Sequence, residues 1–305
     1  MLCGNQEGEW GVGFLAAELN RYGLRATFFT EVFAAEIFGK EALRPVMGRL
    51  LDADQDVQLH LHPIFLRYAE YIKDGRFPPV KIGAWPDAML SYSEQEQTRL
   101  IEHGMDIFRC ISGREPVAFR AGGYLADRVT LRCLAGAGIH LDSSANPAYG
   151  ASFPDEPLTD NQIRCLEGVW EIPITVARTH FPDRTPLKHL EISALSFGEL
   201  KAVLLAAYRY GMRHVVLILH SFSMVKPRDI AYELFRPDWL VIRRFRKLLE
   251  FLAENPGTFR ARTFEELSRD GIEGDATDST FLPDLGSIRP GLRKIVQAIN
   301  RVYWI

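Results

Sequence analysis

Strand-like and helix-like segments alternate along this chain over about 260 residues, which restricts it to folds built on a parallel sheet. The strand-like runs are residues 26–30, 57–62, 116–120, 139–142, 169–176, 214–220 and 258–262. Seven such runs favour closure into a barrel over an open sheet, so we predict an α/β fold of the distorted (β/α)7 type. In such barrels the active site lies at the carboxyl ends of the strands.

The composition excludes several classes of function. The chain has 305 residues, of which 47% are hydrophobic and 25% charged, as in ordinary soluble proteins. A net charge of −3 gives no basic field for nucleic acid, and no apolar run is long enough to span a membrane. The N-terminus lacks the features of a signal peptide, and the 4 cysteines are widely spaced with no C-x-x-C pair. We therefore expect a cytoplasmic protein with reduced thiols.

We expect one domain, residues 1–270, followed by a tail, residues 271–305. The tail begins with an acidic, polar and turn-rich stretch that predicts a linker. Residues 289–305 then predict an amphipathic helix with Arg293, Lys294 and Arg301 on its positive side. In one interpretation this helix packs on the barrel, and in the other it makes a peripheral contact with the inner membrane.

The segment DVQLHLHP, residues 56–63, carries the strongest chemical signal. His60 and His62 are two residues apart in a strand-like run, so their imidazoles project from the same face. The alternating apolar residues predict a buried opposite face formed by Val57, Leu59 and Leu61. Two neutral imidazoles on one face are a common way to hold a divalent metal such as zinc. The alternative is a pair of histidines satisfied by hydrogen bonds at the end of a strand.

Other polar residues also end or closely follow strand-like runs, namely Arg120, Asp142, Glu171 and His220. A histidine there is either hydrogen-bonded in place or a catalytic acid or base, since imidazole titrates near neutrality. A charged Arg120 needs a carboxylate partner, so we expect an ion pair with Asp142 or Glu171 that can coexist with a catalytic role. Asp142 can equally cap the following turn. The pair Gly122–Gly123 either lets the backbone approach another group closely or forms a plain turn.

No motif of another enzyme class is complete. The glycines at 11 and 13 lack a preceding strand and a third glycine, so they form no dinucleotide loop. Ser221 does not lie in a G-x-S-x-G nucleophile motif. His180 and His189 lie in a predicted loop from which they could contact a substrate, and nothing more supports a role for them.

A set of short motifs, in this order and spacing, is similar to those of one enzyme family. They are residues 23–29 (GLRATFF), 57–63 (VQLHLHP), 119–124 (FRAGGY), 141–144 (LDSS), 170–173 (WEIP), 217–221 (LILHS) and 263–267 (TFEEL). Together they resemble the polysaccharide deacetylases, the NodB-homology group of carbohydrate esterase family 4. Within that group the chain looks most like the WalW-like branch of lipopolysaccharide biosynthesis. The resemblance covers residues 10–268.

The resemblance implies a distorted barrel and a divalent metal, usually zinc, held by one Asp and two His. It also implies that water attacks an acetamide carbonyl with the help of the metal and a carboxylate base, while a histidine protonates the leaving amine. By position, His60 matches the first metal histidine, His220 the acid histidine and Arg120 the arginine that orients the base. We add Asp142 to the catalytic residues. The residues expected at the substrate are Gly122, Gly123, Tyr124, Trp170 and Ile218.

Two departures from the family pattern matter. The second metal histidine of the family comes four residues after the first, where this chain has Ile64, so we predict that His62 replaces it. The family also opens with a strand that ends in Asp-Asp or Asp-Thr-Glu, yet this chain has no Asp before Asp52. Either the true start lies upstream of Met1, or Glu7 or Glu9 stands in, or the protein is no longer a hydrolase. We favour a lost first strand, which would leave a gap in the barrel wall and the metal site one ligand short.

The sequence therefore predicts a metal-dependent carbohydrate deacetylase that acts on an N-acetylated sugar of a bacterial surface polysaccharide or lipopolysaccharide precursor. The expected partner is this glycan substrate, with no nucleic acid and no membrane span. The alternative is a catalytically degenerate barrel that binds a glycan or a protein partner. A third interpretation is hydrolysis of another amide or ester by the same metal-assisted chemistry.

Overall fold

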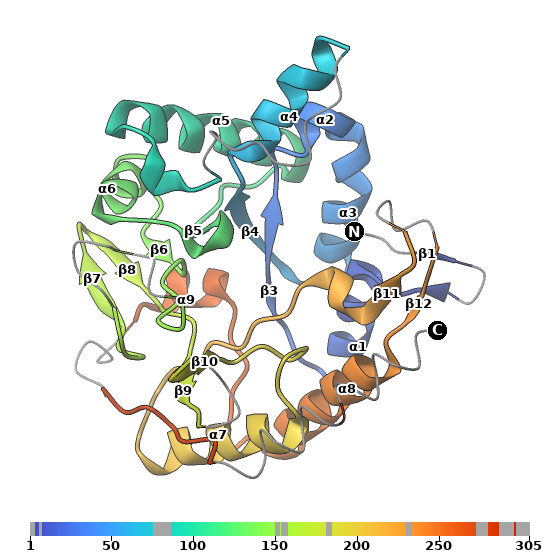
Figure 1. The fold of residues 1–305 in the computed structure, drawn as a ribbon, viewed down its shortest axis with the longest axis vertical. Coiled ribbons are helices and arrows are strands. Elements are labelled where there is room, and N and C mark those ends of the chain that lie inside the picture. The colour runs from blue at the N-terminus through green and yellow to red at the C-terminus, as the bar shows by residue number, and fades with distance from the viewer. Residues whose placement is uncertain are drawn as a thin grey trace.

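The computed structural model describes residues 4–5, 8–75, 87–149, 153, 158–180, 185–229, 234–272, 280–286 and 296. These residues form a mixed α/β fold around a six-stranded sheet (Figure 1). Its strands, in spatial order, are β3 (Thr27–Glu31), β4 (Asp56–Leu61), β5 (Ala118–Ala121), β6 (Leu141–Asp142), β8 (Val169–Glu171) and β7 (Arg164–Leu166). Neighbouring strands are parallel from β3 to β8, and β7 is antiparallel to β8. The predicted parallel sheet is confirmed.

Helices surround the sheet, and in Figure 1 α3, α5 and α6 lie on the outer side of β3, β4 and β5. The α-helices are α1 (Val12–Arg21), α2 (Ala35–Phe38), α3 (Lys40–Asp52), α4 (Ile64–Lys73), α5 (Glu94–Ser112), α6 (Arg128–Gly136), α7 (Phe197–Arg209), α8 (Trp239–Glu254) and α9 (Phe264–Asp270). Short 3-10 helices are η1 (Met89–Ser91), η2 (Gly122–Tyr124) and η3 (Ser221–Met224). Three small hairpins pair β1 (Gly4–Asn5) with β2 (Gly8–Glu9), β9 (Val176–Arg178) with β10 (Leu187–His189), and β11 (Val225–Pro227) with β12 (Phe235–Pro237).

Several helix starts can be predicted from local sequence, because SEQE at 93–96, SFGE at 196–199 and TFEE at 263–266 have the pattern of a capping box and Asp127 is a typical cap residue. Capping boxes open α5 at Ser93, α7 at Ser196 and α9 at Thr263, and Asp127 accepts from the backbone at the start of α6. Each satisfies amides that have no partner inside the helix. These local signals determine the first residue of each of these connecting helices.

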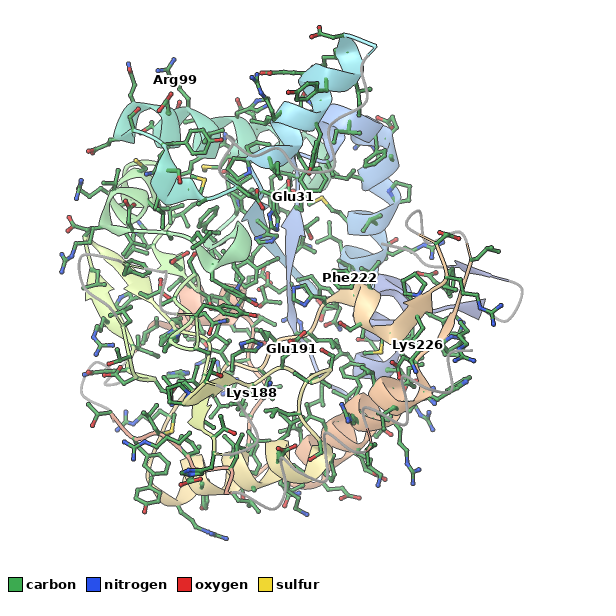
Figure 2. All side chains as sticks on the ribbon, in the orientation of Figure 1. Glu31, Arg99, Lys188, Glu191, Phe222 and Lys226 are labelled. Atoms are coloured by element: carbon green, nitrogen blue, oxygen red, sulfur yellow. The ribbon has the colours of Figure 1, made fainter. Side chains whose placement is uncertain are left out.

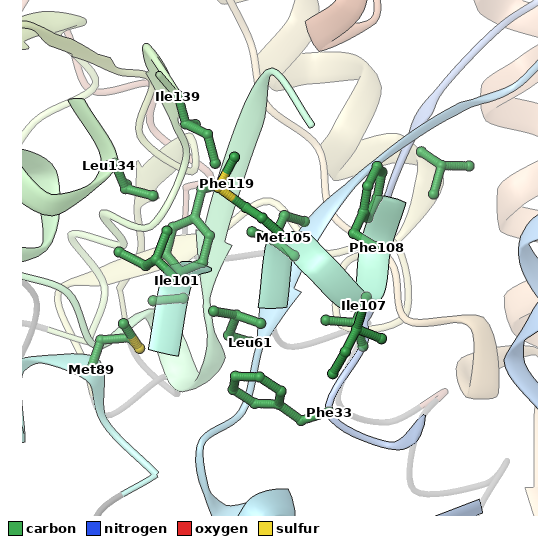
Figure 3. Close-up of a cluster of buried hydrophobic side chains, with 14 of the residues drawn as sticks. Phe33, Leu61, Met89, Ile101, Met105, Ile107, Phe108, Phe119, Leu134 and Ile139 are labelled. Atoms are coloured by element: carbon green, nitrogen blue, oxygen red, sulfur yellow. The ribbon is translucent and has the colours of Figure 1, made fainter. Parts of the chain in front are cut away.

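One face of β4 is buried under α5, which explains why the histidines project from the other face. Leu59 and Leu61 are completely buried and pack against apolar residues of α5 (Figure 3). Gly104 of α5 lies so close that a Cβ there would be 2.6 Å from Cδ2 of Leu61. Burying a leucine side chain contributes about 1.5–3 kcal/mol. This packing fixes the alternation of β4, and with it the direction of His60.

The sheet ends at β3 in the described part of the chain, and all five residues of this strand are only half-buried. The predicted strand 214–220 is extended but forms no continuous ladder. Its Ile218 exchanges backbone hydrogen bonds with Leu190 and Ile192, whereas the amide of Val216 donates to the side-chain oxygen of Thr175. A side chain thus takes the place of the backbone acceptor that a ladder would need. The structure gives a parallel sheet, and full closure of a seven-stranded barrel stays a prediction.

Three further predicted elements differ from the structure. The strand predicted at 169–176 divides into β8 and β9, because Pro173 between them has no amide to donate to a ladder. The strand predicted at 258–262 is absent from the described residues, since the amides of Thr258 and Phe259 turn back to the carbonyl of Asn255. The aromatic and proline-bearing stretch of residues 63–90 predicts a long loop. In the structure this stretch contains α4, and its residues 76–86 lie outside the described residues.

Residues 280–286 of the tail pack on the domain. Arg178 of β9 donates its amide to Pro283 O at 2.7 Å, and Leu285 donates back to Arg178 O at 3.0 Å. Leu285 is buried. The helix predicted over residues 289–305 lies outside the described residues except for Val296. None of the described helices combines the length and the apolar character that a membrane span requires.

Candidate metal centre

The pairing of β3, β4 and β5 places three ionisable residues in one row. Glu31 pairs with His60 across β3 and β4, and His60 pairs with Arg120 across β4 and β5. Residues paired across parallel strands project from the same face of a sheet. Figure 2 shows Glu31 at the tip of β3, and this row therefore lies at the carboxyl ends of the strands. The position matches the sequence-based expectation for a functional site.

Glu31, His60 and His62 form a group that could hold a metal ion. One ligand atom from each residue lies within 4.8 Å of the other two. The two imidazole rings are 4.8 Å apart between centroids and nearly perpendicular, at 84°. His62 follows the last residue of β4, so the expected same-face projection of the two histidines is made.

The backbone fixes which nitrogen of His60 is free. Nδ1 of His60 lies 2.6 Å from the carbonyl oxygen of Arg120. A carbonyl only accepts, so Nδ1 carries the proton and Nε2 keeps its lone pair. Burial, and then the nearby charge of His62, lower the pKa of His60 to about 3. The side chain is therefore neutral at physiological pH, which is the form that ligates metals.

A carboxylate fixes the second imidazole in the same way. Nδ1 of His62 donates to Oδ2 of Asp87 at 2.5 Å, and Oδ1 of Asp87 accepts from the amide of Ile64 at 3.2 Å. A histidine that donates one ring N–H to a carboxylate and offers the other nitrogen outward is the usual arrangement of a metal ligand. Gly122 packs against the ring, where a Cβ would lie 2.5 Å from Nδ1. The close backbone approach expected at the glycine pair is thus made to the His62 ring.

Glu31 is the carboxyl group among the three candidate ligands. Its Oε1 accepts from the amide of Phe33 at 2.6 Å, and its Oε2 accepts from the amide of His62. Burial raises the pKa of Glu31 well above its ordinary range, and the charge of Asp87 raises it further. A cation beside this carboxyl group would reverse that effect. One carboxylate and two imidazoles are a donor set that zinc takes in catalytic sites, so the residues fit a divalent metal.

Arg120 does not form the ion pair that we predicted for it. Its Nε donates to Ser143 O at 2.9 Å and its Nη2 to Ser143 Oγ at 2.8 Å, while the guanidinium lies 4.3 Å over the Phe29 ring. Within the described residues no carboxylate lies within ion-pair distance of it. The register explains the error, because Asp142 pairs with Phe119 and not with Arg120. A shift of one residue moves a side chain to the opposite face of the sheet.

Asp142 and Glu171 form a separate pair of carboxyl groups. They are paired in register on β6 and β8, and both are completely buried. Asp142 accepts from Ser144 Oγ at 2.7 Å and from its amide at 3.1 Å, and Glu171 Oε1 accepts from the amide of Ala145 at 3.0 Å. Glu171 Oε2 has no donor within the described residues. Burial raises the pKa of both groups, and the charge of Asp142 raises that of Glu171 further, so the neutral form of Glu171 is favoured.

His220 belongs to a second polar group around Glu191. The carboxylate accepts from His220 Nδ1 at 3.3 Å, from His189 Nε2 at 3.2 Å and from Ser193 Oγ at 2.8 Å. Burial alone would raise the pKa of Glu191, but these three hydrogen bonds hold it well below its ordinary range. The charge of His220 also contributes to the lowered pKa of His60, so this group lies within electrostatic range of the metal-ligand group.

The residues predicted at the substrate are placed in different ways. Tyr124 has a left-handed backbone, with φ of 64°, and its ring lies 5.7 Å from that of Tyr149. Trp170 packs against an interior cluster together with Phe29, and Ile218 is buried next to the backbone of Glu191. The structure therefore brings Gly122 to the metal-ligand group, Tyr124 to Tyr149, and Trp170 and Ile218 to the interior.

Sequence reasoning missed three residues of these groups, namely Glu31, Asp87 and Glu191, and it named His189 only as a histidine that could contact a substrate. Glu31 had a usable signal, because it is a polar residue that ends a strand-like run. Glu9 is one of the two proposed substitutes for the missing aspartate. Its carboxylate forms an ion pair with Arg49 and accepts a hydrogen bond from the amide of Gly13 at 3.0 Å, so its contacts lie outside the metal-ligand group. Glu7, the other proposed substitute, lies outside the described residues.

Comparison with known proteins adds a likeness of fold. The structure is similar to the crystal structure of a candidate polysaccharide deacetylase from Mycobacterium smegmatis, with a TM-score of 0.50 and 15% sequence identity. The similarity covers 86% of this chain and 76% of that chain. No model of a protein family matches the sequence, and no curated protein matches it significantly.

Proposed function

We propose that this protein is a metal-dependent deacetylase of an N-acetylated sugar, with zinc as the metal. The observation that carries the proposal is the group of Glu31, His60 and His62, in which both histidines have Nδ1 engaged and Nε2 left as a ligand. The likeness of fold to a candidate polysaccharide deacetylase supports the substrate class. In its finer parts, the proposal is that the sugar belongs to a bacterial surface polysaccharide or lipopolysaccharide precursor and that the chain is of the WalW-like branch.

The residues of the chain divide the work of hydrolysing an acetamide. Glu31, His60 and His62 would hold the metal, which when bound supplies a Lewis acid and lowers the pKa of water. His220 has Nδ1 held by Glu191, so its Nε2 is free to give a proton to the leaving nitrogen. Gly122 and Asp87 keep the His62 ring in place.

The roles of two predicted catalytic residues remain predictions. Arg120 lies in the same row as the ligands. Within the described residues, however, no carboxylate lies close enough to Arg120 to be a base that it orients. Asp142 lies beside Glu171, where its burial and its contacts with Ser144 favour a structural role.

These two findings favour the second candidate function, a barrel that binds glycan without hydrolysing it. Such a protein would keep the metal and the saccharide contacts and lack only the base. Acetate release therefore separates the two functions, because both predict binding and only the first predicts a product.

Zinc content and acetate release test the proposal together. The purified chain is freed of metal, titrated with zinc, and incubated with oligomers of N-acetylglucosamine, beside the variants Glu31→Ala, His60→Ala and His62→Ala. We expect one tightly bound zinc, lost in all three variants together with acetate release. His140→Ala is the matched control, since this histidine bonds to Gly168 O and lies outside the group. Absence of zinc binding in the wild type, or its retention in the variants, would refute the site.

A further inference from the structure

Two exposed aromatic rings, Tyr149 and Phe222, are connected to Glu191 through its histidine partners and have no role in the hydrolysis described above. Each of the two histidines that bond to Glu191 contacts one exposed aromatic ring. Tyr149 lies 5.1 Å from His189 between ring centroids, and Phe222 stacks on His220 at 4.9 Å. Tyr149 is 56% exposed and Phe222 is 42% exposed. Two exposed rings therefore each contact an imidazole, and both imidazoles bond to the same carboxylate.

The backbone holds Tyr149 where it is. Its amide donates to Asn146 O at 3.0 Å, and Ala148 donates to Asn146 Oδ1 at 3.2 Å, so a turn presents the ring. Asn146 itself is buried. The ring also lies 5.7 Å from that of Tyr124, which has a strained left-handed backbone. The contacts with two other rings already hold the Tyr149 side chain in place. A ligand that binds to its exposed face would therefore lose little further side-chain entropy.

A continuous series of contacts links these rings to the metal-ligand group. Gly122 touches the His62 ring, and Tyr124 follows it in η2. Tyr124 contacts Tyr149, Tyr149 contacts His189, and His189 bonds to Glu191. Glu191 bonds to His220. Tyr149 therefore belongs to one connected set of contacts that begins at the metal-ligand group and ends at His220.

The other large apolar side chains that are exposed in the described residues have no such position. Phe38, Tyr208 and Trp239 belong to or flank α2, α7 and α8, and none of them has a ring contact with a residue of the Glu191 group. Tyr208, for example, is as exposed as Tyr149, at 56%, but its ring contact is with Phe259. Exposure of an aromatic ring is common on proteins, so the connection to the Glu191 group is what distinguishes Tyr149 and Phe222.

We propose that Tyr149 and Phe222 form a saccharide subsite, in which their rings contact the apolar faces of sugar rings and Glu191, which bonds to both of the histidines that they contact, accepts from hydroxyl groups. Binding sites of this kind combine aromatic surface with a few fixed polar groups. The choice of a sugar as ligand rests on the proposed function. The placement of the two rings does not, because it follows from the contacts of His189 and His220.

Binding of the N-acetylglucosamine tetramer tests the subsite by calorimetry on the full chain loaded with zinc. Loss of one stacking ring costs about tenfold in affinity, so Tyr149→Ala and Phe222→Ala should each weaken binding by about that factor. Tyr149→Phe keeps the ring and should bind within about twofold of the wild type. Tyr208→Ala and Phe38→Ala are matched controls with equally or more exposed rings, and they should bind as the wild type does.

The same variants separate this inference from the proposed function. A saccharide contact predicts that Tyr149→Ala raises KM for acetate release far more than it lowers kcat. Binding that depends on Tyr149 and Phe222 without any acetate release would refute the hydrolase and leave the subsite standing. Wild-type affinity in both alanine variants, with thermal melting that shows them folded, would overturn the subsite. So would failure of the wild type to bind the tetramer at all.

Discussion

Asp87 accepts the Nδ1 proton of His62 at 2.5 Å and so decides which nitrogen of that imidazole faces Glu31 and His60. The contact joins two segments separated by 25 positions in the sequence. It gives the candidate metal centre an outer carboxylate of the kind that orients metal-ligating histidines.

Replacing this carboxylate should weaken the metal centre without removing a ligand. In Asp87→Asn the amide can present its nitrogen to His62 and favour the wrong tautomer, so zinc affinity should fall by about 10- to 100-fold. Competition with a chelator of known affinity measures the change. Glu36→Gln is the matched control, because Glu36 bonds to His103 at 3.1 Å in an equivalent carboxylate–histidine pair outside the centre. An equal loss in both variants would contradict a specific role for Asp87.

The close contact of Gly122 with the His62 ring predicts that no side chain is tolerated there. A Cβ would lie 2.5 Å from Nδ1 and 2.8 Å from Cγ, so the ring or the backbone must move in Gly122→Ala. Overpacking of this kind costs about 1–3 kcal/mol of unfolding free energy, and the displaced ring should lose zinc affinity as well.

Gly136→Ala is the control for this substitution. Gly136 ends α6 and has open space around the position of its Cβ, so alanine there should leave zinc affinity unchanged. Urea unfolding and a zinc titration check both variants. A Gly122→Ala protein with unaltered zinc affinity would show that the contact does not position His62.

The buried pair of Asp142 and Glu171 predicts a loss of stability with rising pH. The pKa of Glu171 is raised well above its ordinary value of 4.5 in the folded state. The protonated form is therefore favoured by folding, and its contribution is complete below pH 4.5 and is lost as pH rises through the folded pKa. The slope from this one group is at most about 1.4 kcal/mol per pH unit.

Glu171→Gln isolates that contribution. The amide stays neutral at every pH, can donate to Asp142 and can still accept from Ala145, so its unfolding free energy should fall less between pH 5 and pH 9. Urea unfolding of both proteins across that range gives the difference in slope. Parallel curves for the two proteins would mean that folding does not favour the protonated form of Glu171.

Leu61 connects the core to the metal ligands, because it lies between His60 and His62 and packs against α5 on the other face of β4. Leu61→Ala should cost about 2–5 kcal/mol of unfolding free energy through the cavity that it leaves. Ile72→Ala, at a side chain that is 47% exposed, should cost far less. Chemical denaturation of the two variants tests the difference, and similar losses would place Leu61 outside the core.

The parts of the fold that sequence reasoning predicted are those set by neighbouring residues. The capping box at Ser93 depends on a glutamate three positions later, and the shared face of His60 and His62 depends on a spacing of two. Both can be read from the chain without knowing what lies next to it. Glu31 was within reach of the same logic, as the residue that ends its strand.

The errors come from relations between distant segments. Whether Asp142 or Ser143 meets Arg120 depends on the register of β5 and β6, and a shift of one residue exchanges them. The predicted ion pair of Arg120 failed for that reason. Asp87 and Glu191 reach their histidines across segments whose path the hydrophobic pattern does not specify.

The edge position of β3 has a consequence for handling the protein. A strand that ends a ladder in the described structure presents backbone donors and acceptors on its outer side, and such an edge can template pairing with another chain. Only one of its five residues, Glu31, carries a charge that would oppose stacking of copies, and burial favours the neutral form of that residue. Aggregation at high protein concentration should therefore begin at this strand, and light scattering during concentration of the sample would reveal it.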